Sequence, residues 1–253
     1  IIFLIIFILI FFTIMNQFKS AWQFAFTHWQ FLAVLAFPVF LVEIITAYYL
    51  TDATLLLEAG NMDDIGLYFE TNSMPITLLS FISIVLSISF TGGVFVAFDA
   101  LTEGKDIKPF DALFIGFKKF FPLLGALMLC YLIFSLGFLM LILPGFYLAG
   151  RLGLTPAYVM FEGTGVRGSI AKSWEVTDEH GTILFFLTFT FFALSSALAM
   201  IVISVLPMAA GGGSSILQLI LAGIIEYTFV FPWAYIYFSL YTSLKSSASN
   251  AVK

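Results

Sequence analysis

The chain has 253 residues, of which 61% are apolar and 10% are charged, whereas soluble domains are about 45–50% apolar and about 25% charged. A water-soluble core cannot hide that much apolar surface, so lipid must be part of the solvent of this protein. The formal net charge of −5 and the lack of a Lys/Arg-rich run argue against nucleic acid as a partner.

Few residues are suited to redox or metal chemistry. Cys130 is the one cysteine, so neither an intrachain disulfide nor a cysteine-based metal site is expected. His28 and His180 lie far apart, and neither has an HxxxH or HExxH neighbourhood. We therefore predict no metal and no cofactor.

The first 14 residues form an unbroken apolar stretch, and Met15 is the first methionine. Three explanations are open: translated upstream sequence, a truncated additional transmembrane helix, or a signal-like hydrophobic region. The stretch lacks the basic flank and the small-residue cleavage site of a secretory signal. We treat residues 1–14 as an apolar extension of uncertain status and residues 15–253 as a single six-helix membrane domain.

Six segments are apolar and long enough to be considered as transmembrane helices. A hydrocarbon core about 30 Å thick needs about 20 apolar residues in a helix. That window predicts spans at residues 31–50, 75–98, 122–143, 146–161, 182–206 and 216–244. The fourth would reach only about 24 Å at about 1.5 Å per residue, and Pro156 interrupts it. This segment could be re-entrant rather than spanning.

The charges between the segments favour six crossings. Residues 51–74 carry five acidic residues and no basic one. If all six segments cross, nine of the ten basic residues lie on the opposite side. An excess of Lys and Arg marks the cytoplasmic side, so we expect both ends of the six-helix core to face the cytoplasm.

Two outer connections fit this topology. Leu143, Pro144 and Gly145 predict a tight turn that joins the third and fourth spans as a hairpin, because proline ends a helix and glycine permits the reversal. Residues 210–214 have the sequence AGGGS, which predicts a flexible loop between the fifth and sixth spans.

Three segments on the basic side combine aromatic and basic residues at helical spacing. Apolar positions three and four residues apart with such flanks indicate short amphipathic helices in the inner membrane interface. An equally open alternative is that each segment is a cytoplasmic extension of the following span, packed on its neighbours. The expected interface anchors are Trp22, Trp29, Lys118, Lys119 and Trp174. The expected fold is an all-α polytopic membrane bundle of about six transmembrane helices with short amphipathic interface helices on the cytoplasmic side.

Ionisable groups inside a membrane span are costly and by default indicate function. Glu43, Arg151 and Glu226 lie within predicted spans, at similar depths of roughly 8–15 Å below the outer boundary at a helical rise per residue. We hypothesise that Arg151 pairs with Glu43 or Glu226 in the bundle interior. A purely structural ion pair, or an arginine that snorkels outward, is favoured over a substrate or proton pathway.

A family resemblance rests on the middle of the chain. The residues that carry it are Leu143-Pro144-Gly145, an apolar run to Phe161-Glu162-Gly163, and the stretch GSIAKSW at 168–174. They are similar to the YciC family of uncharacterised bacterial inner-membrane proteins, and to the membrane domain of some glycerophosphodiester phosphodiesterases. The resemblance implies a six-helix protein of the bacterial inner (plasma) membrane without an assigned biochemical role. It supplies no catalytic residues.

Motif searches favour a protein that is not an enzyme. No nucleophile elbow, phosphate-binding loop or dinucleotide fingerprint occurs in the sequence. Our first hypothesis is a non-enzymatic inner-membrane protein that organises the envelope, with membrane lipids as partners. The alternative is a small-solute or ion transporter or channel that uses Glu43, Arg151 and Glu226. The sequence identifies no protein partner.

Overall fold

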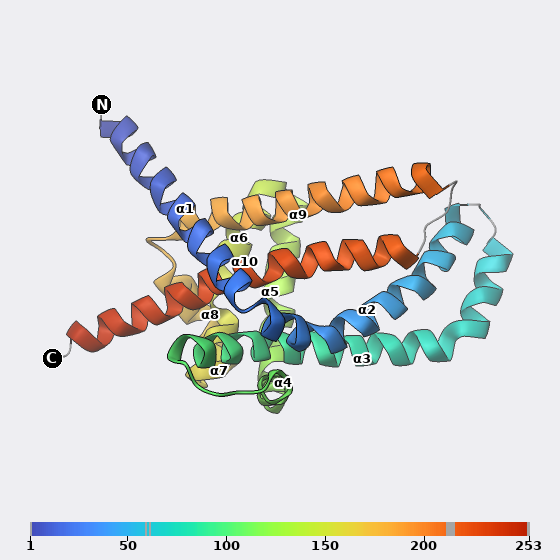
Figure 1. The fold of residues 1–253 in the computed structure, drawn as a ribbon, viewed down its shortest axis with the longest axis horizontal. Helices are drawn as coiled ribbons and strands as arrows, with labels where there is room; N and C mark the ends of the chain where they lie inside the picture. The colour runs from blue at the N-terminus through green and yellow to red at the C-terminus, as the bar shows by residue number, and fades with distance from the viewer. Residues whose placement is uncertain (1, 59, 61, 211–215, 252–253) are drawn as a thin grey trace.

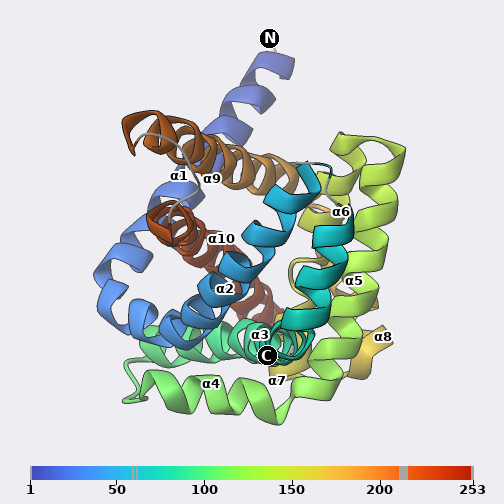
Figure 2. The same ribbon diagram turned by 90° about the vertical axis from the view of Figure 1, so that its right-hand side faces the viewer.

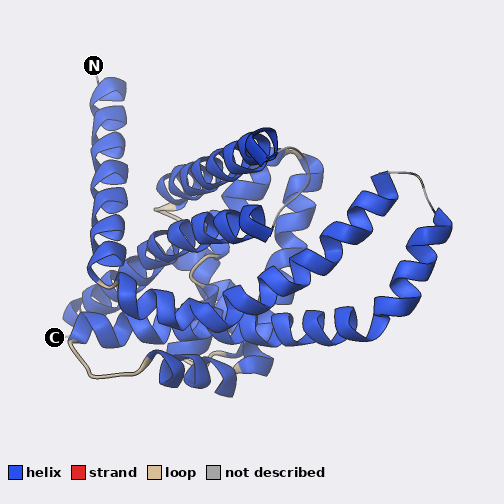
Figure 3. Cartoon of the chain, turned by 45° about the vertical axis from the view of Figure 1, so that its right-hand side comes forward, coloured by secondary structure: helices blue, strands red, loops and turns tan. Residues whose placement is uncertain are grey.

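The computed structural model describes residues 2–58, 60, 62–210 and 216–251, which fold into helices joined by short connections (Figures 1 and 3). No strand occurs in these ranges. The expected all-α membrane bundle is therefore confirmed. In chain order the helices are α1 (Ile2–Thr27), α2 (Trp29–Glu58), α3 (Met62–Glu103), α4 (Pro109–Lys118), α5 (Phe120–Met140), α6 (Ile142–Leu152), α7 (Thr155–Phe161), α8 (Gly165–Val176), α9 (Gly181–Ala210) and α10 (Ile216–Ala251).

Five of the described helices are long and apolar enough to cross a membrane, namely α2, α3, α5, α9 and α10. They contain the first, second, fifth and sixth predicted spans, and the third as far as Met140, where α5 ends. The fourth predicted span, residues 146–161, is divided between α6 and α7. The count of six crossings therefore depends on whether these two short helices together complete one passage.

Packing explains where α6 stops and α7 starts. The ring of Tyr237 lies so close to Gly153 that any Cβ there would clash with it, and Gly153 is the residue at which α6 ends. Pro156 lies in the first turn of α7, where its missing N–H would have had no helical partner. Proline therefore begins α7 instead of interrupting a continuous span.

The α6–α7 pair returns along the whole length of α5. Gly137, near the end of α5, lies against Gly145 of α6. Near the middle of α5, the Sγ atom of Cys130 is 3.7 Å from Oγ1 of Thr155. At the start of α5, the Nζ atom of Lys119 donates to a backbone carbonyl of α7 at 3.2 Å. The broken segment therefore follows the path expected of the fourth crossing, as two helices instead of one.

The turn between α5 and α6 precedes the predicted position. Leu141 is the extended residue that links them, with φ −166° and ψ 150°, whereas Pro144 and Gly145 lie inside α6. The prediction of the turn at residues 143–145 is wrong because proline is well tolerated in the first helical turn. Gly145 serves close packing, since a Cβ there would clash with the ring of Phe138. The predicted loop at 210–214 falls almost entirely outside the described residues.

Helix α3 has two halves with different surroundings. Its 42 residues give a length of about 63 Å along the helix axis, about twice the thickness of a hydrocarbon core. The first half exposes large apolar side chains, including those of Leu67, Leu78 and Phe81. The second half, from Ile88 to Ala100, is mostly buried by other helices. This half belongs to the protein core, whereas the first half is exposed and begins with the acidic residues Asp63, Asp64 and Glu70, which precede the second predicted span.

Glycines seat the short helix α4 directly on the buried half of α3. A Cβ on Gly116 would clash with the carbonyl oxygen of Ser89, and a Cβ on Gly93 would lie 3.0 Å from the carbonyl oxygen of Ala112. Such contacts between backbones are possible only where neither helix carries a side chain. Helix α4 is therefore fixed to the core by one face, and its other face stays exposed.

The two long hairpins point the same way. In Figure 1 the C-terminal ends of α2 and α9 lie at the same end of the molecule, on the right. Figures 1 and 2 together show that α5 is steeply inclined to α9 and α10. The helices converge on a common core opposite the hairpin ends. Its fully buried large side chains include Leu32, Phe98, Leu154, Leu187, Tyr237 and Phe238.

Candidate functional site: a lipid-facing groove and its polar supports

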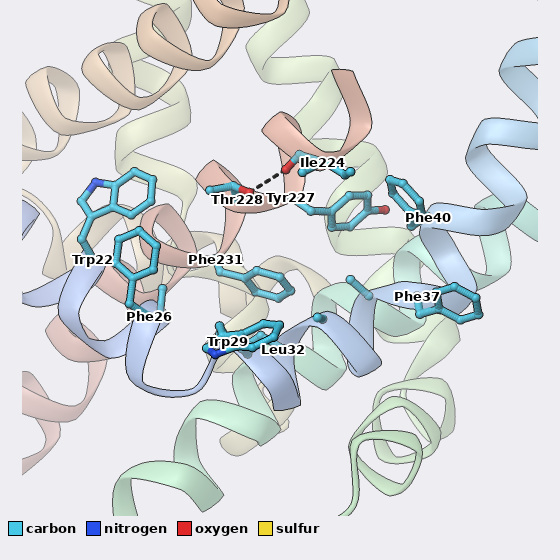
Figure 4. Close-up of a pocket in the computed structure, with 13 residues that line it drawn as sticks. Trp22, Phe26, Trp29, Leu32, Phe37, Phe40, Ile224, Tyr227, Thr228 and Phe231 are labelled. Carbon is cyan, nitrogen blue, oxygen red and sulfur yellow. Dashed lines mark hydrogen bonds between the residues drawn. The ribbon is translucent and has the colours of Figure 1, made fainter. Parts of the chain in front are cut away.

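An apolar groove of about 610 Å³ lies between the α1–α2 junction and α10. Figure 4 shows Trp22 and Phe26 of α1 at one end and Phe37 and Phe40 of α2 at the other. The aromatic ring of Phe231 on α10 faces them from the opposite wall (Figure 4). Ligand pockets of this size are typically concave and mostly apolar, so the groove is the main candidate binding site.

The junction between α1 and α2 is a bend in a nearly continuous helix. The N–H of His28 donates to the carbonyl of Phe24 at 3.1 Å, and the N–H of Leu32 donates to the carbonyl of His28 at 3.1 Å. Helical hydrogen bonds therefore pass through the bend. The bend turns α1 away from α2, and this opens the end of the groove lined by Trp22.

Glu43 lies behind the groove in a small polar network that joins three helices. Its carboxylate accepts a hydrogen bond from Ser87 Oγ of α3 at 2.9 Å and one from the Tyr227 hydroxyl of α10 at 2.5 Å. Hydrogen bonds to a carboxylate are stronger than neutral ones. The network therefore ties α2 to α3 and α10 beside the groove, and it turns the polar end of Tyr227 away from the groove.

Arg151 lies at the C-terminal end of α6, and its side chain is 3% exposed. Nε donates to Thr177 Oγ1 at 3.0 Å, Nη1 to the Tyr147 hydroxyl at 2.8 Å and Nη2 to the carbonyl of Trp174 at 2.5 Å. Nη2 also lies 2.9 Å from Oδ1 of Asp178. The guanidinium therefore holds α6 against the end of α8 and the connection that leads to α9.

The backbone of Arg151 is part of the same arrangement. Its carbonyl accepts hydrogen bonds from Ser173 Oγ at 2.8 Å and from Thr177 Oγ1 at 3.0 Å. Carbonyls in the last turn of a helix have no partner within that helix. Because α6 stops at Leu152, hydroxyls from α8 and from Thr177 just beyond it take over the role of the missing turn.

The predicted pairing of Arg151 with Glu43 or Glu226 is wrong. Arg151 pairs with Asp178, Glu43 bonds to Ser87 and Tyr227, and Glu226 is exposed on α10. The depth argument assumed one straight fourth span that meets the other spans side by side. Instead α6 ends early, and the connection from α8 to α9 reaches Arg151. A functional role for these three ionisable residues stays a prediction.

Sequence reasoning missed the partners of these charges. A signal for Thr177 and Asp178 was present, because both follow directly on the aromatic–basic segment that ends near Trp174. No comparable signal pointed to Ser87 and Tyr227, which are ordinary members of apolar helices. Only the packing of α3 and α10 on α2 brings them to Glu43.

The segment that contains the expected anchors Trp22 and Trp29 is divided between the core and the surface. Trp22 packs edge-on against Phe229 of α10 with ring centroids 5.1 Å apart, and its ring also stacks near Phe191 of α9. Trp29 and Phe26 are exposed instead. Part of the aromatic stripe of this segment therefore packs on the bundle and the rest faces outward, while its position in a membrane interface stays a prediction.

The other anchors also differ from one another. Lys118 is exposed, and its Nζ lies 5.0 Å from the centroid of the Phe114 ring. Lys119 points inward to the carbonyl of Val159. Trp174 is partly exposed and lies under the Arg151 guanidinium, 4.2 Å from the ring centroid. Lys118 thus retains an outward position, whereas Lys119 and Trp174 also hold the fold together.

Side chains that could bind a metal ion do not cluster among the described residues. Among these residues, no group of three His, Cys, Asp or Glu side chains could hold a metal ion. Cys130 is buried within the α5–α7 packing. The polar groups at Glu43 and Arg151 are instead surrounded mainly by hydroxyls, with Asp178 also paired to Arg151.

Comparison with known proteins gives two partial similarities. The chain is 28% identical over 127 residues to a UPF0259 membrane protein of Pectobacterium carotovorum, which covers 49% of this chain and 51% of that protein. It is 28% identical over 96 residues to a UPF0259 membrane protein of Photorhabdus laumondii, with 38% of each chain covered. No family model and no solved structure matches.

These similarities cover less of the chain than the YciC resemblance suggested. The chain spans about half the length, or less, of the relatives it matches. Both relatives are named as bacterial membrane proteins of an uncharacterised group, UPF0259, to which the YciC family also belongs. The link to glycerophosphodiester phosphodiesterases has no support in these comparisons. This chain is similar to membrane proteins of the uncharacterised UPF0259 group.

Proposed function

We propose that this protein is a non-enzymatic, multi-pass protein of the bacterial inner membrane that organises the envelope through contacts with lipids. The exposed face of α4 is the observation that carries the proposal. Phe110, Phe114 and Phe117 lie on that face, next to the exposed Lys118. Aromatic side chains with an adjacent basic residue on an amphipathic helix suit the boundary between headgroups and acyl chains.

The seating of α4 explains why this face is available for lipid. Its opposite face is fixed to α3 by the close contact between Gly116 and Ser89. A helix that carries three exposed aromatic rings without a cover would be an aggregation hazard in water. In a membrane interface the same rings are buried in lipid, and the protein holds a defined lipid-contacting surface.

The alternative, a solute or ion transporter, has less support. It depended on Glu43, Arg151 and Glu226 meeting in the bundle interior. Glu43 and Arg151 are each occupied by bonds that join helices, and they lie in separate clusters. Such bonds favour a structural role for these two residues. They do not favour a continuous pathway for charge.

Spin labelling of α4 tests the proposal. In a Cys130→Ser background, nitroxide labels at Phe114→Cys and Phe117→Cys should show high collision rates with oxygen, which concentrates in lipid. Their collision rates with a water-soluble nickel chelate should be low. A label at Asp111→Cys, on the same helix but at a polar position, is the matched control. If all three labels collide mainly with the nickel chelate, α4 lies in water and the proposal fails.

A second measurement addresses lipid organisation. Protein extracted directly into polymer-bounded native discs should carry a lipid composition different from that of the whole membrane. Phe114→Glu with Phe117→Glu should shift that composition toward the membrane average, because the altered face no longer enters the interface. Identical lipid composition in wild type, variant and membrane would contradict an organising role.

A further inference from the structure

The groove between the α1–α2 junction and α10 is built from distant parts of the chain. Its walls come from helices distant in sequence, with Leu32 and Ala36 on α2 and Tyr227 and Phe231 on α10. Gly223 brings α10 close to the far end of the groove, since a Cβ there would lie 2.9 Å from Cε2 of Phe40. The groove is thus bounded on two sides and closed at the Phe40 end.

The helices that form the groove also determine which kind of molecule can enter it. Both α2 and α10 are long and apolar enough to cross a membrane, so the mouth of the groove opens toward hydrocarbon. Along α2 the lining runs from Trp29 to Phe40, a distance of about 16.5 Å at the helical rise. That distance is close to half of a hydrocarbon core about 30 Å thick. The groove therefore has the depth of one leaflet.

The size of the groove suits an acyl chain. Its volume is about 610 Å³, and its lining along α2 extends about 16.5 Å at the helical rise. An extended hydrocarbon chain can lie along this length in contact with the apolar walls. A second copy of the chain, docked by one of its helices, is the other occupant that the test below distinguishes.

Both hydroxyl groups in the lining are already bonded, whereas the buried Nε1 of Trp22, at the open end, has no partner among the described residues. The Tyr227 hydroxyl donates to Glu43, and the Thr228 hydroxyl donates to the carbonyl of Ile224 at 2.6 Å (Figure 4). An occupant therefore finds an apolar lining and needs no polar groups of its own along this length. This matches the chemistry of a saturated or monounsaturated chain.

The open end of the groove has a different chemistry. There it continues into a shallow hollow on α1 that shares Trp22 and Phe26 and is also lined by Lys19 and Gln23. Lys19 is exposed, one helical turn before Trp22. A basic side chain beside aromatic rings suits the phosphate of a lipid headgroup.

We propose that this groove binds one acyl chain of an anionic phospholipid, with the phosphate of the lipid at Lys19. The proposal deepens the proposed lipid association and rests on it. The two tests are independent, because the groove is lined by α1, α2 and α10 and α4 contributes no residue to it.

Fluorescence quenching by a brominated lipid tests the groove. Purified protein in detergent is titrated with phosphatidylglycerol that carries bromine in the middle of one acyl chain, and quenching of tryptophan fluorescence is followed. Trp22 and Trp29 line the groove, so quenching should saturate at about one lipid per protein. Ala33→Phe, which fills the groove from its exposed wall, should weaken the apparent affinity at least tenfold.

Matched variants keep the test decisive. Val34 is the next residue, is also exposed and does not line the groove, so Val34→Phe should titrate like wild type. Thr228→Phe fills the groove from α10 and replaces Ala33→Phe if that variant does not fold. Lys19→Gln should weaken binding of phosphatidylglycerol but not of brominated diacylglycerol, which lacks the phosphate.

Three outcomes would overturn the proposal. The first is quenching that never saturates, and the second is equal affinity in Val34→Phe and both groove-filling variants. The third is a wild-type dimer that Ala33→Phe converts to a monomer, because the groove would then hold a second copy of the chain. If labels on α4 report lipid but the groove titration fails, the proposed function stands without this site.

Discussion

Replacing Arg151 by methionine separates two explanations of its buried position. Methionine keeps most of the length of the side chain and removes all of its hydrogen bonds. If the ion pair with Asp178 holds the fold, Asp178→Asn should be as costly as Arg151→Met. If the hydrogen bonds to Thr177, Tyr147 and the Trp174 carbonyl hold it, only Arg151→Met should be costly.

The structure favours the second explanation by a clear margin. The side chain of Asp178 is 77% exposed, and exposed ion pairs contribute about 0–1 kcal/mol. Each bond from a charged donor to a buried acceptor contributes about 1.5–3 kcal/mol. Part of this free energy is regained in the variant because the acceptors rehydrate or find new partners. We therefore expect Arg151→Met to lower the free energy of unfolding by about 3–5 kcal/mol and Asp178→Asn by less than about 1 kcal/mol.

Reversible unfolding in mixed micelles measures both values. Wild type and variants are titrated with a denaturing detergent, and the folded fraction is followed by circular dichroism. Arg151→Lys should fall between the two, because an ammonium group keeps the charge but lacks the planar fork that reaches three acceptors. Equal losses for Asp178→Asn and Arg151→Met would refute the hydrogen-bond explanation and restore the ion pair as the main contribution.

Two other predictions concern helix packing and topology. Gly116→Ala should lower the free energy of unfolding by about 1–3 kcal/mol, because its Cβ would clash with Ser89 of α3. Gly66→Ala, also in a helix but with open space around it, should leave stability unchanged or raise it by up to about 1 kcal/mol in the same unfolding assay. For topology, in a Cys130→Ser background, Glu58→Cys should react with an impermeant maleimide in spheroplasts, and Ser246→Cys should react only after the membrane is permeabilised. Labelling of both cysteines before permeabilisation would overturn the predicted sidedness.

The sequence by itself determined the fold class and the approximate location of the long helices. Apolar runs of about 20 residues leave few structures available in lipid, because every backbone polar group must be bonded internally. This is why α2, α3, α5, α9 and α10 each contain all or most of a predicted span. The aromatic and basic pattern also identified α4 as an amphipathic helix.

Tertiary structure alone decided how the charged residues are used and where the groove lies. The rise per residue places Glu43, Arg151 and Glu226 at similar depths only if every span is straight and parallel to its neighbours. Tyr237 packs directly on Gly153 where α6 ends, and the steep inclination of α5 to α9 and α10 changes which groups meet. These are contacts between residues distant in the chain, and a hydropathy pattern carries no information about them. The groove likewise exists only because α1 bends away from α2 and α10 faces the opening.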